Sequence, residues 1–319
     1  MTGRKVLVDT DTGVDDALAL LTVLAAPDTD VVGVGSVFGN CTQDQAAANA
    51  LTVLAAAGRT DIPVCIGQPR PGPPPATPSP HGRDGLGDRG LRPPGGVHPA
   101  PKSAVEQILR VSHQQPGQVD LLCLAPLTNI AVALEQDPLV LTRFRSVTIM
   151  GGMGAHSLRD TETARQPMFL AKGDTNTNHD PAAAAAVADA PGSITWVGMN
   201  VTGRLRMPWA DLTARAERST TAAFVREITE NYHRYCTTTY GADEPIYTSH
   251  DSVAASVMLD PDIILSASEA TGQVHHDDNR ATLWGHETGP GPTHRFVTDL
   301  DYPAIRQRID GVLKADASI

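Results

Sequence analysis

The 319-residue sequence has few aromatic residues, no surplus of positive charge and no long apolar segment. Aromatic residues make up 4% of the chain and hydrophobic residues 41%, so we expect a core of mainly Ala, Val, Leu and Ile. The formal net charge of -11 argues against a nucleic-acid partner, because binding a polyanion requires excess Lys and Arg. No run approaches the roughly 18 apolar residues of a membrane span, and no apolar signal-peptide segment opens the chain. We therefore expect a cytoplasmic protein without membrane contact.

Closely spaced cysteines are also missing. The chain has four cysteines, Cys41, Cys65, Cys123 and Cys236, and none forms a CxxC pair. This spacing excludes a zinc ribbon and predicts reduced, mostly buried thiols.

Short apolar runs alternate with Ala- and Leu-rich segments along the chain. Residues 5–10 (KVLVDT) predict a strand, residues 15–26 (DDALALLTVLAA) a helix and residues 30–40 (DVVGVGSVFGN) a strand, and one long helix is expected around residues 219–236. This alternation predicts a single α/β domain over residues 1–319, with a largely parallel central sheet and helices on both faces. In such folds the site lies beyond the carboxyl ends of the strands.

Prolines and glycines concentrate in residues 69–101, which hold 11 of the 25 prolines. A stretch of this composition could be a linker, but it contains the specific sequence HGRDGLGD. We therefore interpret it as a long active-site loop within the one domain.

Four aspartates, Asp9, Asp11, Asp15 and Asp16, crowd the segment VLVDTDTGVDDALAL at residues 6–20. Capping of a helix N-terminus explains one or two acidic residues, but four would repel one another and raise one another's pKa values unless a cation lies among them. Carboxylate oxygens at this density suit a hard ion such as Ca²⁺ or Mg²⁺. The sequence therefore favours a metal site over capping alone.

Two other metal chemistries begin with the same D-x-D spacing. A calcium loop of the EF-hand kind requires a glutamate at its twelfth position, where this chain has Leu20. A haloacid-dehalogenase-like phosphatase would use Asp9 as nucleophile and Asp11 as acid, but Asn178 stands where its second late aspartate belongs. The phosphatase remains an alternative, as does a non-catalytic protein that binds calcium and nucleoside.

The chain resembles the Ca²⁺-dependent nucleoside hydrolases of the inosine-uridine preferring type. The segment DTDTGVDDALA matches the family signature D-x-D-P-G-x-D-D-A-x-A and departs from it only at Thr12. Further family motifs follow in order: FGN ending at Asn40, HGRDGLG from His81, APLTNIA around Thr128, MGG at 150–152, NVT at 200–202 and HDSVAA from His250. The resemblance covers essentially the whole chain. It implies the nucleoside hydrolase fold, which is Rossmann-like, and hydrolysis of the N-glycosidic bond of a ribonucleoside by Ca²⁺-bound water.

The resemblance also implies a role for each matching residue. The calcium ligands would be Asp11, Asp16, the backbone carbonyl of Thr128 and Asp251, with Asp11 also the general base. Asp251 would lie at the substrate as well, Asp15 would bind the ribose 2′-hydroxyl, and Asn40 would support the ligands. Asn176 would hold the ribose hydroxyls, His250 would protonate the leaving base and His81 would contact it. Asp9 would orient the acidic loop.

The departures from the family pattern lie together, in MFLAKGDTNTNHDP. Met168 replaces an Asn, Asp174 a Glu and Thr175 a Phe, and the first two of these positions hold the substrate 5′-hydroxyl in the family. We therefore expect Asp174 to hold the 5′ end differently from the family glutamate. The segment ENYHRYCTTTYGADEPIY offers Tyr235, Tyr240 and Tyr247 as aromatic contacts to the base. The expected partner is a small ribonucleoside, and the expected assembly a homodimer or homotetramer.

Overall fold

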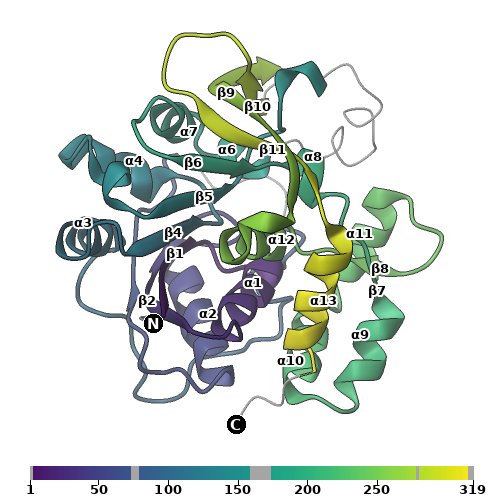
Figure 1. Ribbon diagram of the computed structural model, residues 1–319. Coiled ribbons are helices and arrows are strands. Elements are labelled where there is room, and N and C mark those ends of the chain that lie inside the picture. The colour runs from purple at the N-terminus through teal and green to yellow at the C-terminus, as the bar shows by residue number, and fades with distance from the viewer. Residues whose placement is uncertain (1–2, 73–78, 159–173, 278–279, 315–319) are drawn as a thin grey trace.

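The computed structural model describes residues 3–72, 79–158, 174–277 and 280–314. In this part of the chain, one nine-stranded sheet runs in the order β10-β9-β11-β6-β5-β4-β1-β2-β3, and helices cover both of its faces (Figure 1). The strands are β1 (Arg4–Thr10), β2 (Thr29–Ser36), β3 (Val64–Cys65), β4 (Val119–Cys123), β5 (Ser146–Met150), β6 (Ile194–Val197), β9 (Ile264–Asp277), β10 (Arg280–His286) and β11 (His294–Leu300). The prediction of a single α/β domain is confirmed.

The middle of the sheet is parallel, as predicted. From β11 to β3 in the sheet order, each strand pairs in parallel with its neighbour. The strand β1 lies between β2 and β4, and its residues from Val6 onward are buried. A strand covered on both faces needs a continuous apolar run rather than an alternating one, which is what VLV at the centre of β1 provides.

The edge that carries β9 and β10 is antiparallel. The strand β9 pairs antiparallel with both β10 and β11, so the late part of the chain adds a twisted hairpin to the parallel sheet. The sequence prediction did not include this flank.

Helices form a layer on each face of the sheet, with separate hydrophobic clusters beneath them. One cluster includes Leu18, Val257 and Ile305, and the other includes Ile108, Ile130 and Val187. In Figure 1, α3, α4 and α7 lie along one side of the sheet and α1, α12 and α13 along the other. The helices are α1 (Val14–Leu24), α2 (Gln43–Ala56), α3 (Ala104–Gln114), α4 (Thr128–Gln136), α6 (Thr175–His179), α7 (Pro181–Ala188), α8 (Met199–Thr202), α9 (Trp209–Ala216), α10 (Thr220–Thr229), α11 (Tyr232–Tyr240), α12 (His250–Leu259) and α13 (Tyr302–Val312).

The prediction of one long helix around residues 219–236 is wrong. The segment forms two helices, α10 and α11, which are separated at Glu230 and Asn231. The Asn231 side chain donates a hydrogen bond of 3.2 Å to the Gly87 carbonyl, in the Pro/Gly-rich stretch. Asn is a weak helix former, and its side chain bonds readily to backbone groups outside the helix. This contact lies at the break between α10 and α11 and helps to stabilise it.

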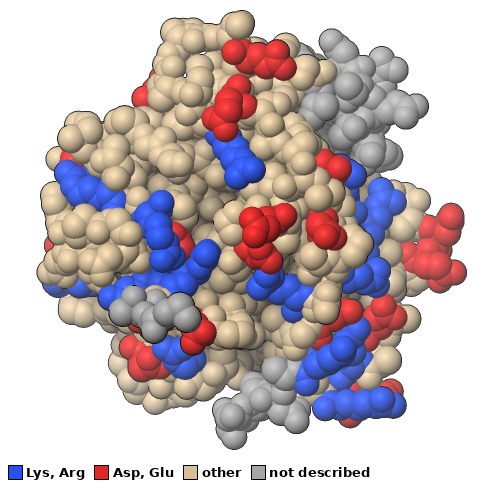
Figure 2. Space-filling view, in the orientation of Figure 1, with Lys and Arg blue, Asp and Glu red and all other residues tan. Residues whose placement is uncertain are grey.

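The composition of the chain also gave expectations about its cysteines, about membrane-spanning helices and about surface charge. The four cysteines, all within the described part of the chain, form no disulfide bond; Cys41 is half-buried and the other three are buried. Among the described residues, every helix is too short or too polar to cross a bilayer. On the face shown in Figure 2, Lys and Arg stand in small groups among Asp and Glu. Ion pairs also link helices: Arg215 of α9 lies 3.0 Å from Asp310 of α13.

Candidate active site

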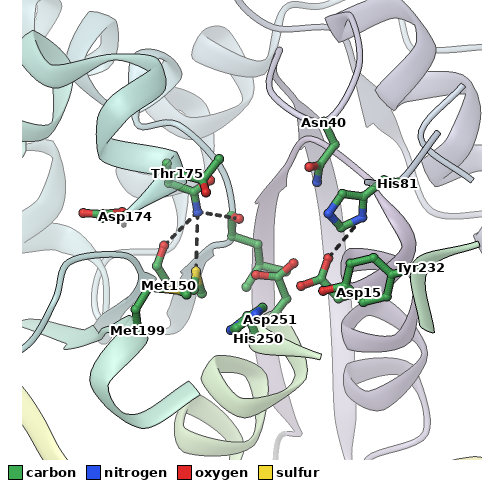
Figure 3. A pocket seen from close by; sticks show the side chains of 12 residues that line it. Asp15, Asn40, His81, Met150, Asp174, Thr175, Met199, Tyr232, His250 and Asp251 are labelled. Carbon is green, nitrogen blue, oxygen red and sulfur yellow. Dashed lines mark hydrogen bonds and ion pairs between the residues drawn. The ribbon is translucent and has the colours of Figure 1, made fainter. Parts of the chain in front are cut away.

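A pocket opens beyond the carboxyl ends of the parallel strands, where the fold predicts it (Figure 3). Leu124 directly follows β4, Met150 ends β5, and Asp15 and Asn40 lie in the segments after β1 and β2. Six residues that the family resemblance places at the substrate line this pocket, and so does His250: Asp15, Asn40, His81, Asp174, Asn176 and Asp251. Figure 3 shows Asn40, His81 and Asp15 on one wall, Met150 and Thr175 on the other, and Asp251 between them.

The acidic turn between β1 and α1 is held by its own hydrogen bonds. Asp16 accepts the Gly13 N–H at 2.9 Å, which caps the helix, and the Thr10 hydroxyl at 2.5 Å. Asn40 donates its backbone N–H and its side-chain amide to the Asp11 carboxylate, at 2.7 and 3.0 Å. Thr12, where the family has proline, has a φ of 21°, which a proline ring fixed near about -65° cannot adopt. These hydrogen bonds fix the turn, and Asp15 is the one of its four aspartates that lines the pocket.

The helix α12 brings Asp251 to this turn from the late part of the chain. Ser249 caps α12 and also donates its hydroxyl to the Asp15 carbonyl at 3.2 Å, which joins α12 to α1. Carboxylate oxygens of Asp15, Asp16 and Asp251 lie within 4.8 Å of one another. Asp16 also contacts Asp11 side chain to side chain, so it lies at the centre of the cluster.

Burial and mutual repulsion make this cluster electrostatically costly. Asp11, Asp16 and Asp251 are almost completely buried. Burial, followed by repulsion from Asp16, raises the pKa of Asp11 well above its usual value; burial, followed by repulsion from Asp15, does the same for the pKa of Asp251. The hydrogen bonds from Thr10 and Gly13 only partly oppose the effect of burial on the pKa of Asp16. Crowded carboxylates of this kind fit a hard divalent cation with oxygen ligands.

Thr128 begins α4, directly beyond the end of β4. Its hydroxyl donates a hydrogen bond of 2.6 Å to Asp180. The next residue, Asn129, donates to Asp9 at 2.7 Å and to the Ser36 carbonyl at 2.9 Å. These bonds fix the start of α4 against the ends of β1 and β2. The Thr128 carbonyl as a calcium ligand stays a prediction.

His81 reaches the pocket from a loop whose conformation is held by hydrogen bonds to polar side chains. Asp84 accepts backbone N–H groups from Leu86, Asp88 and Gly90, and Asn49 donates both to the Asp84 carbonyl and to the Thr12 carbonyl.

The imidazole that this loop presents faces both the acidic turn and an aromatic ring. The His81 Nδ1 accepts the Val14 N–H at 3.1 Å and lies 3.6 Å from the Asp15 carboxylate. Its ring centre lies 4.7 Å from that of Tyr232. The motif HGRDGLGD therefore places His81 beside the acidic turn.

His250 is held at both ring nitrogens. Its Nδ1 lies 2.9 Å from the Thr202 hydroxyl, and its Nε2 lies 3.4 Å from the Tyr240 hydroxyl. If Thr202 donates to Nδ1, the ring proton of a neutral imidazole is at Nε2. The side chain lines the pocket next to Asp251 and is well placed to exchange a proton with a bound molecule.

The segment with the family departures uses its polar groups to anchor α6. Asp174 caps α6 by accepting the Thr177 N–H at 3.2 Å, and it accepts the Gly152 N–H at 2.8 Å. Asn176 donates its amide to the carbonyls of Leu124 and Met150, each at 3.0 Å (Figure 3). Met168 lies outside the described residues.

The tyrosines named as base contacts need correction. Tyr232 lines the pocket, whereas Tyr235, Tyr240 and Tyr247 are not among its lining residues. Tyr240 instead meets His250 through its hydroxyl, and the buried Tyr247 packs against Trp209. These tyrosines were named because the segment is rich in aromatic residues, and composition does not indicate which ring faces the pocket. Met150, the first residue of the MGG motif, also lines the pocket, as do Leu124 and Met199, which lie in none of the motifs named from the sequence.

Buried carboxylates and two imidazoles thus line a pocket at the carboxyl edge of the parallel sheet, the position at which α/β folds carry their active sites. Residues 6–307 match the family described as inosine-uridine preferring nucleoside hydrolase, and the chain belongs to this family. It is a nucleoside ribohydrolase, as the resemblance implied.

The matches to individual relatives also span most of the chain. The chain is 32% identical over 265 residues to a probable uridine nucleosidase 2 of Oryza sativa, covering 82% of this chain and 75% of that protein. It is 29% identical over 268 residues to an inosine-uridine preferring nucleoside hydrolase of Leishmania major, covering 82% of this chain and 80% of that protein. Among solved structures, a plant nucleoside hydrolase shares the fold with a TM-score of 0.85 at 24% identity, covering 98% of this chain and 99% of the other. The phosphatase and the non-catalytic binding protein are not favoured.

Proposed function

We propose that the protein hydrolyses ribonucleosides to free base and ribose with the help of a Ca²⁺ ion bound by Asp11, Asp16, Asp251 and the Thr128 carbonyl. The observation that carries this proposal is the convergence of buried carboxylates from both ends of the chain, with pKa values raised by burial and repulsion. When bound, Ca²⁺ would make a coordinated water more acidic and would hold the ribose hydroxyls.

The chain's own residues would supply the remaining chemistry. Asp11 accepts the proton of the attacking water, and Asn40 fixes the orientation of Asp11 with two hydrogen bonds. Asp15 accepts a hydrogen bond from the 2′-hydroxyl. The positive charge that develops on C1′ and the ring oxygen in the transition state is stabilised by the acidic wall.

The imidazole residues would act at the base. His250 donates a proton to the departing base, and Thr202 and Tyr240 hold its ring. His81 and Tyr232, whose rings are in contact, form one surface of the base subsite. Asn176 holds ribose hydroxyls through its carbonyl oxygen, since its amide N–H groups already bond to Leu124 and Met150.

Release of free ribose from uridine and inosine tests the proposal. We expect release by the purified protein, loss of release in excess chelator and recovery on adding Ca²⁺. Asp11→Asn should lower kcat/KM by about 10²–10⁴-fold, the contribution typical of a general base, and the exposed Asp44→Asn should leave it unchanged. Phosphate release from phosphoesters, or nucleoside binding without turnover, would contradict the proposal. Homodimeric or homotetrameric assembly and a cytoplasmic location stay predictions; light scattering tests the first.

A further inference from the structure

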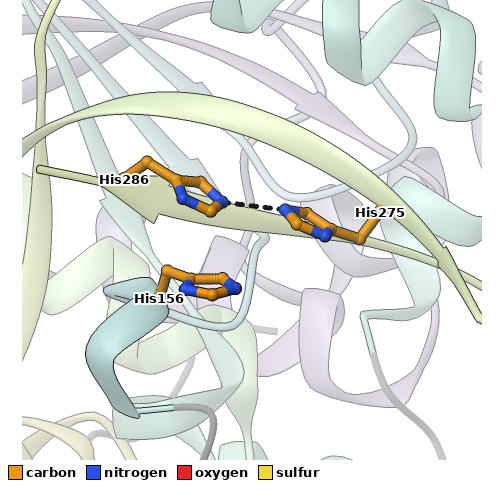
Figure 4. A group of neighbouring side chains, drawn as sticks. All are labelled: His156, His275 and His286. Atoms are coloured by element: carbon orange, nitrogen blue, oxygen red, sulfur yellow. Dashed lines mark hydrogen bonds between the residues drawn. The ribbon is translucent and has the colours of Figure 1, made fainter. Parts of the chain in front are cut away.

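Three histidines that the active site does not use come together on the antiparallel flank of the sheet (Figure 4). His156 begins the short 3-10 helix η2 (His156–Leu158), His275 lies on β9 and His286 lies on β10. All three are half-buried, and one ring nitrogen of each lies within 4.8 Å of the others. None of them lines the nucleoside pocket.

Backbone pairing holds the three side chains in place. His275 pairs with Thr282 and His286 pairs with Thr271, and residues paired in this way project on the same face of an antiparallel hairpin. The segment before His156 is bonded to β10, because Met153 donates to the Leu283 carbonyl at 2.8 Å and Gly285 donates to the Gly154 carbonyl at 2.9 Å. The cluster is therefore built on sheet backbone rather than on loose loops.

The rings are arranged closely. The Nε2 atoms of His275 and His286 lie 2.8 Å apart and point toward each other in Figure 4. The ring centre of His156 lies 4.1 Å from that of His286 and 5.3 Å from that of His275. The Trp284 ring meets His156 edge-on at 6.0 Å and helps to fix it. Imidazole nitrogens are the commonest metal ligands in proteins, and here three of them lie close together.

We propose that His156, His275 and His286 bind a transition-metal dication, with Zn²⁺ the best match. Imidazole nitrogens suit Zn²⁺, and three protein ligands with an open fourth position are a common zinc arrangement. Zn–N bonds of about 2.0–2.1 Å place tetrahedral ligand nitrogens about 3.3 Å apart. The Nε2 atoms of His275 and His286, now 2.8 Å apart, would have to separate slightly to bind one ion. The side chain of His156 would have to rotate to bring a ring nitrogen to the same ion.

This site differs from the carboxylate cluster in both ligand type and role. It has nitrogen ligands, whereas Asp11, Asp16 and Asp251 offer hard oxygen ligands that suit Ca²⁺. A bound Zn²⁺ would connect the hairpin of β9 and β10 to the segment that follows β5. We infer that it stabilises this flank of the sheet rather than taking part in hydrolysis.

The affinity of the untagged protein for Zn²⁺ tests the proposal. It is measured at equilibrium by competition with a chromogenic chelator. Excess Ca²⁺ is present to occupy the carboxylates. We expect one Zn²⁺ per chain that His286→Ala and the nearly isosteric His275→Gln weaken by at least about 100-fold. That loss is larger than the 10–100-fold typical of a group that only orients a ligand. Co²⁺ bound at the site should show the visible absorption of a tetrahedral complex, and both variants should lose it.

His276→Ala is the matched control. His276 is adjacent to His275 on β9 but is exposed and projects to the opposite face of the strand. It should bind Zn²⁺ and Co²⁺ as the wild type does, and all variants should keep wild-type nucleoside hydrolysis, which shows that they fold. Equal Zn²⁺ affinity in the wild type and His275→Gln, or an equal loss in His276→Ala, would overturn the proposal.

Discussion

The sequence offered two interpretations of the aspartate cluster, helix capping and metal binding, and Asp16 is placed for both. It caps α1 through the Gly13 N–H, and it also lies at the centre of the acidic cluster between Asp11 and Asp251. The capping residue and the proposed cation ligand are therefore the same side chain. Sequence reasoning could identify the crowding of aspartates but not this double use, because it depends on the approach of α12 from the other end of the chain.

His250 provides a test of leaving-group protonation. His250→Ala should lower kcat/KM for inosine or uridine by about 10²–10⁴-fold, because the departing base needs a proton. The same variant should cleave 4-nitrophenyl riboside, whose leaving group departs as a stable anion, at close to the wild-type rate. Steady-state kinetics on both substrates measures the contrast, and the exposed His113→Ala is the control. Equal losses on both substrates would rule out the acid role.

Asp9 should make stability depend on pH. Burial raises the pKa of Asp9 to about 7, against the opposing hydrogen bond from Asn129. The folded state therefore binds a proton that the unfolded state has lost, so the free energy of unfolding falls as pH rises toward and through 7. From about pH 4 to pH 8 the loss from this group is up to about 4 kcal/mol.

Asp9→Asn removes that titration and should flatten the pH dependence. Urea unfolding in the presence of a chelator gives the free energy of unfolding at several pH values. The slope of this free energy against pH is compared among Asp9→Asn, the wild type and Asp44→Asn. The test is the slope of stability against pH rather than the absolute stability. The Asp9 Oδ2 atom is buried and has no hydrogen-bond partner among the described residues, so an amide group in its place changes the absolute stability by itself. A slope unchanged in Asp9→Asn would mean that this carboxyl does not titrate in the folded state as its burial requires.

At the scale of elements, α6 shows why the 5′ end of the substrate should be held differently. Asp174 directs its carboxylate to backbone N–H groups of Gly152 and Thr177, which occupies the oxygens that a 5′-hydroxyl would need. We therefore expect kcat/KM to fall only modestly, by about tenfold or less, between inosine and 5′-deoxyinosine. This corresponds to roughly 1.4 kcal/mol of transition-state binding. A loss of several hundred-fold would contradict this view of Asp174.

The elements near the acidic turn were predictable because their sequences agree with their environment. The apolar run of β1 followed by Gly13 and two acidic residues indicates a buried strand, a turn and a capped helix. The break between α10 and α11 was not predictable in the same way. It depends on Asn231 bonding to Gly87, a contact between segments far apart in sequence, and the register of Tyr232 depends on that break.

At the scale of the whole molecule, the parallel part of the sheet follows from alternating strands and helices, whereas the antiparallel flank does not. A strand's own residues do not specify the direction of its neighbour; the connection does. Only a few residues join β9 to β10, and so short a connection permits antiparallel pairing alone. The histidine cluster depends on this hairpin and could not have been found from residue spacing.

Under the proposed function, calcium should raise the stability of the whole domain, because it would bind carboxylates from α1 and α12 together. At free Ca²⁺ about 100 times Kd the gain is about 2.7 kcal/mol, which corresponds to a rise in Tm of several degrees. Asp251→Asn should lose most of this rise, and the exposed Asp262→Asn should keep it. Thermal unfolding in zinc-free buffer with Ca²⁺ or chelator measures the difference, and an identical rise in Asp251→Asn would count against calcium at this cluster.

The meeting of Asp11 and Asp16 with Asp251 also has a consequence for biosynthesis. A ribosome makes the acidic turn well before its partner on α12, which lies far later in the chain. A nascent chain that stops before α12 would therefore carry an unbalanced, strongly anionic turn and no catalytic power. Activity would appear only after α12 has been made.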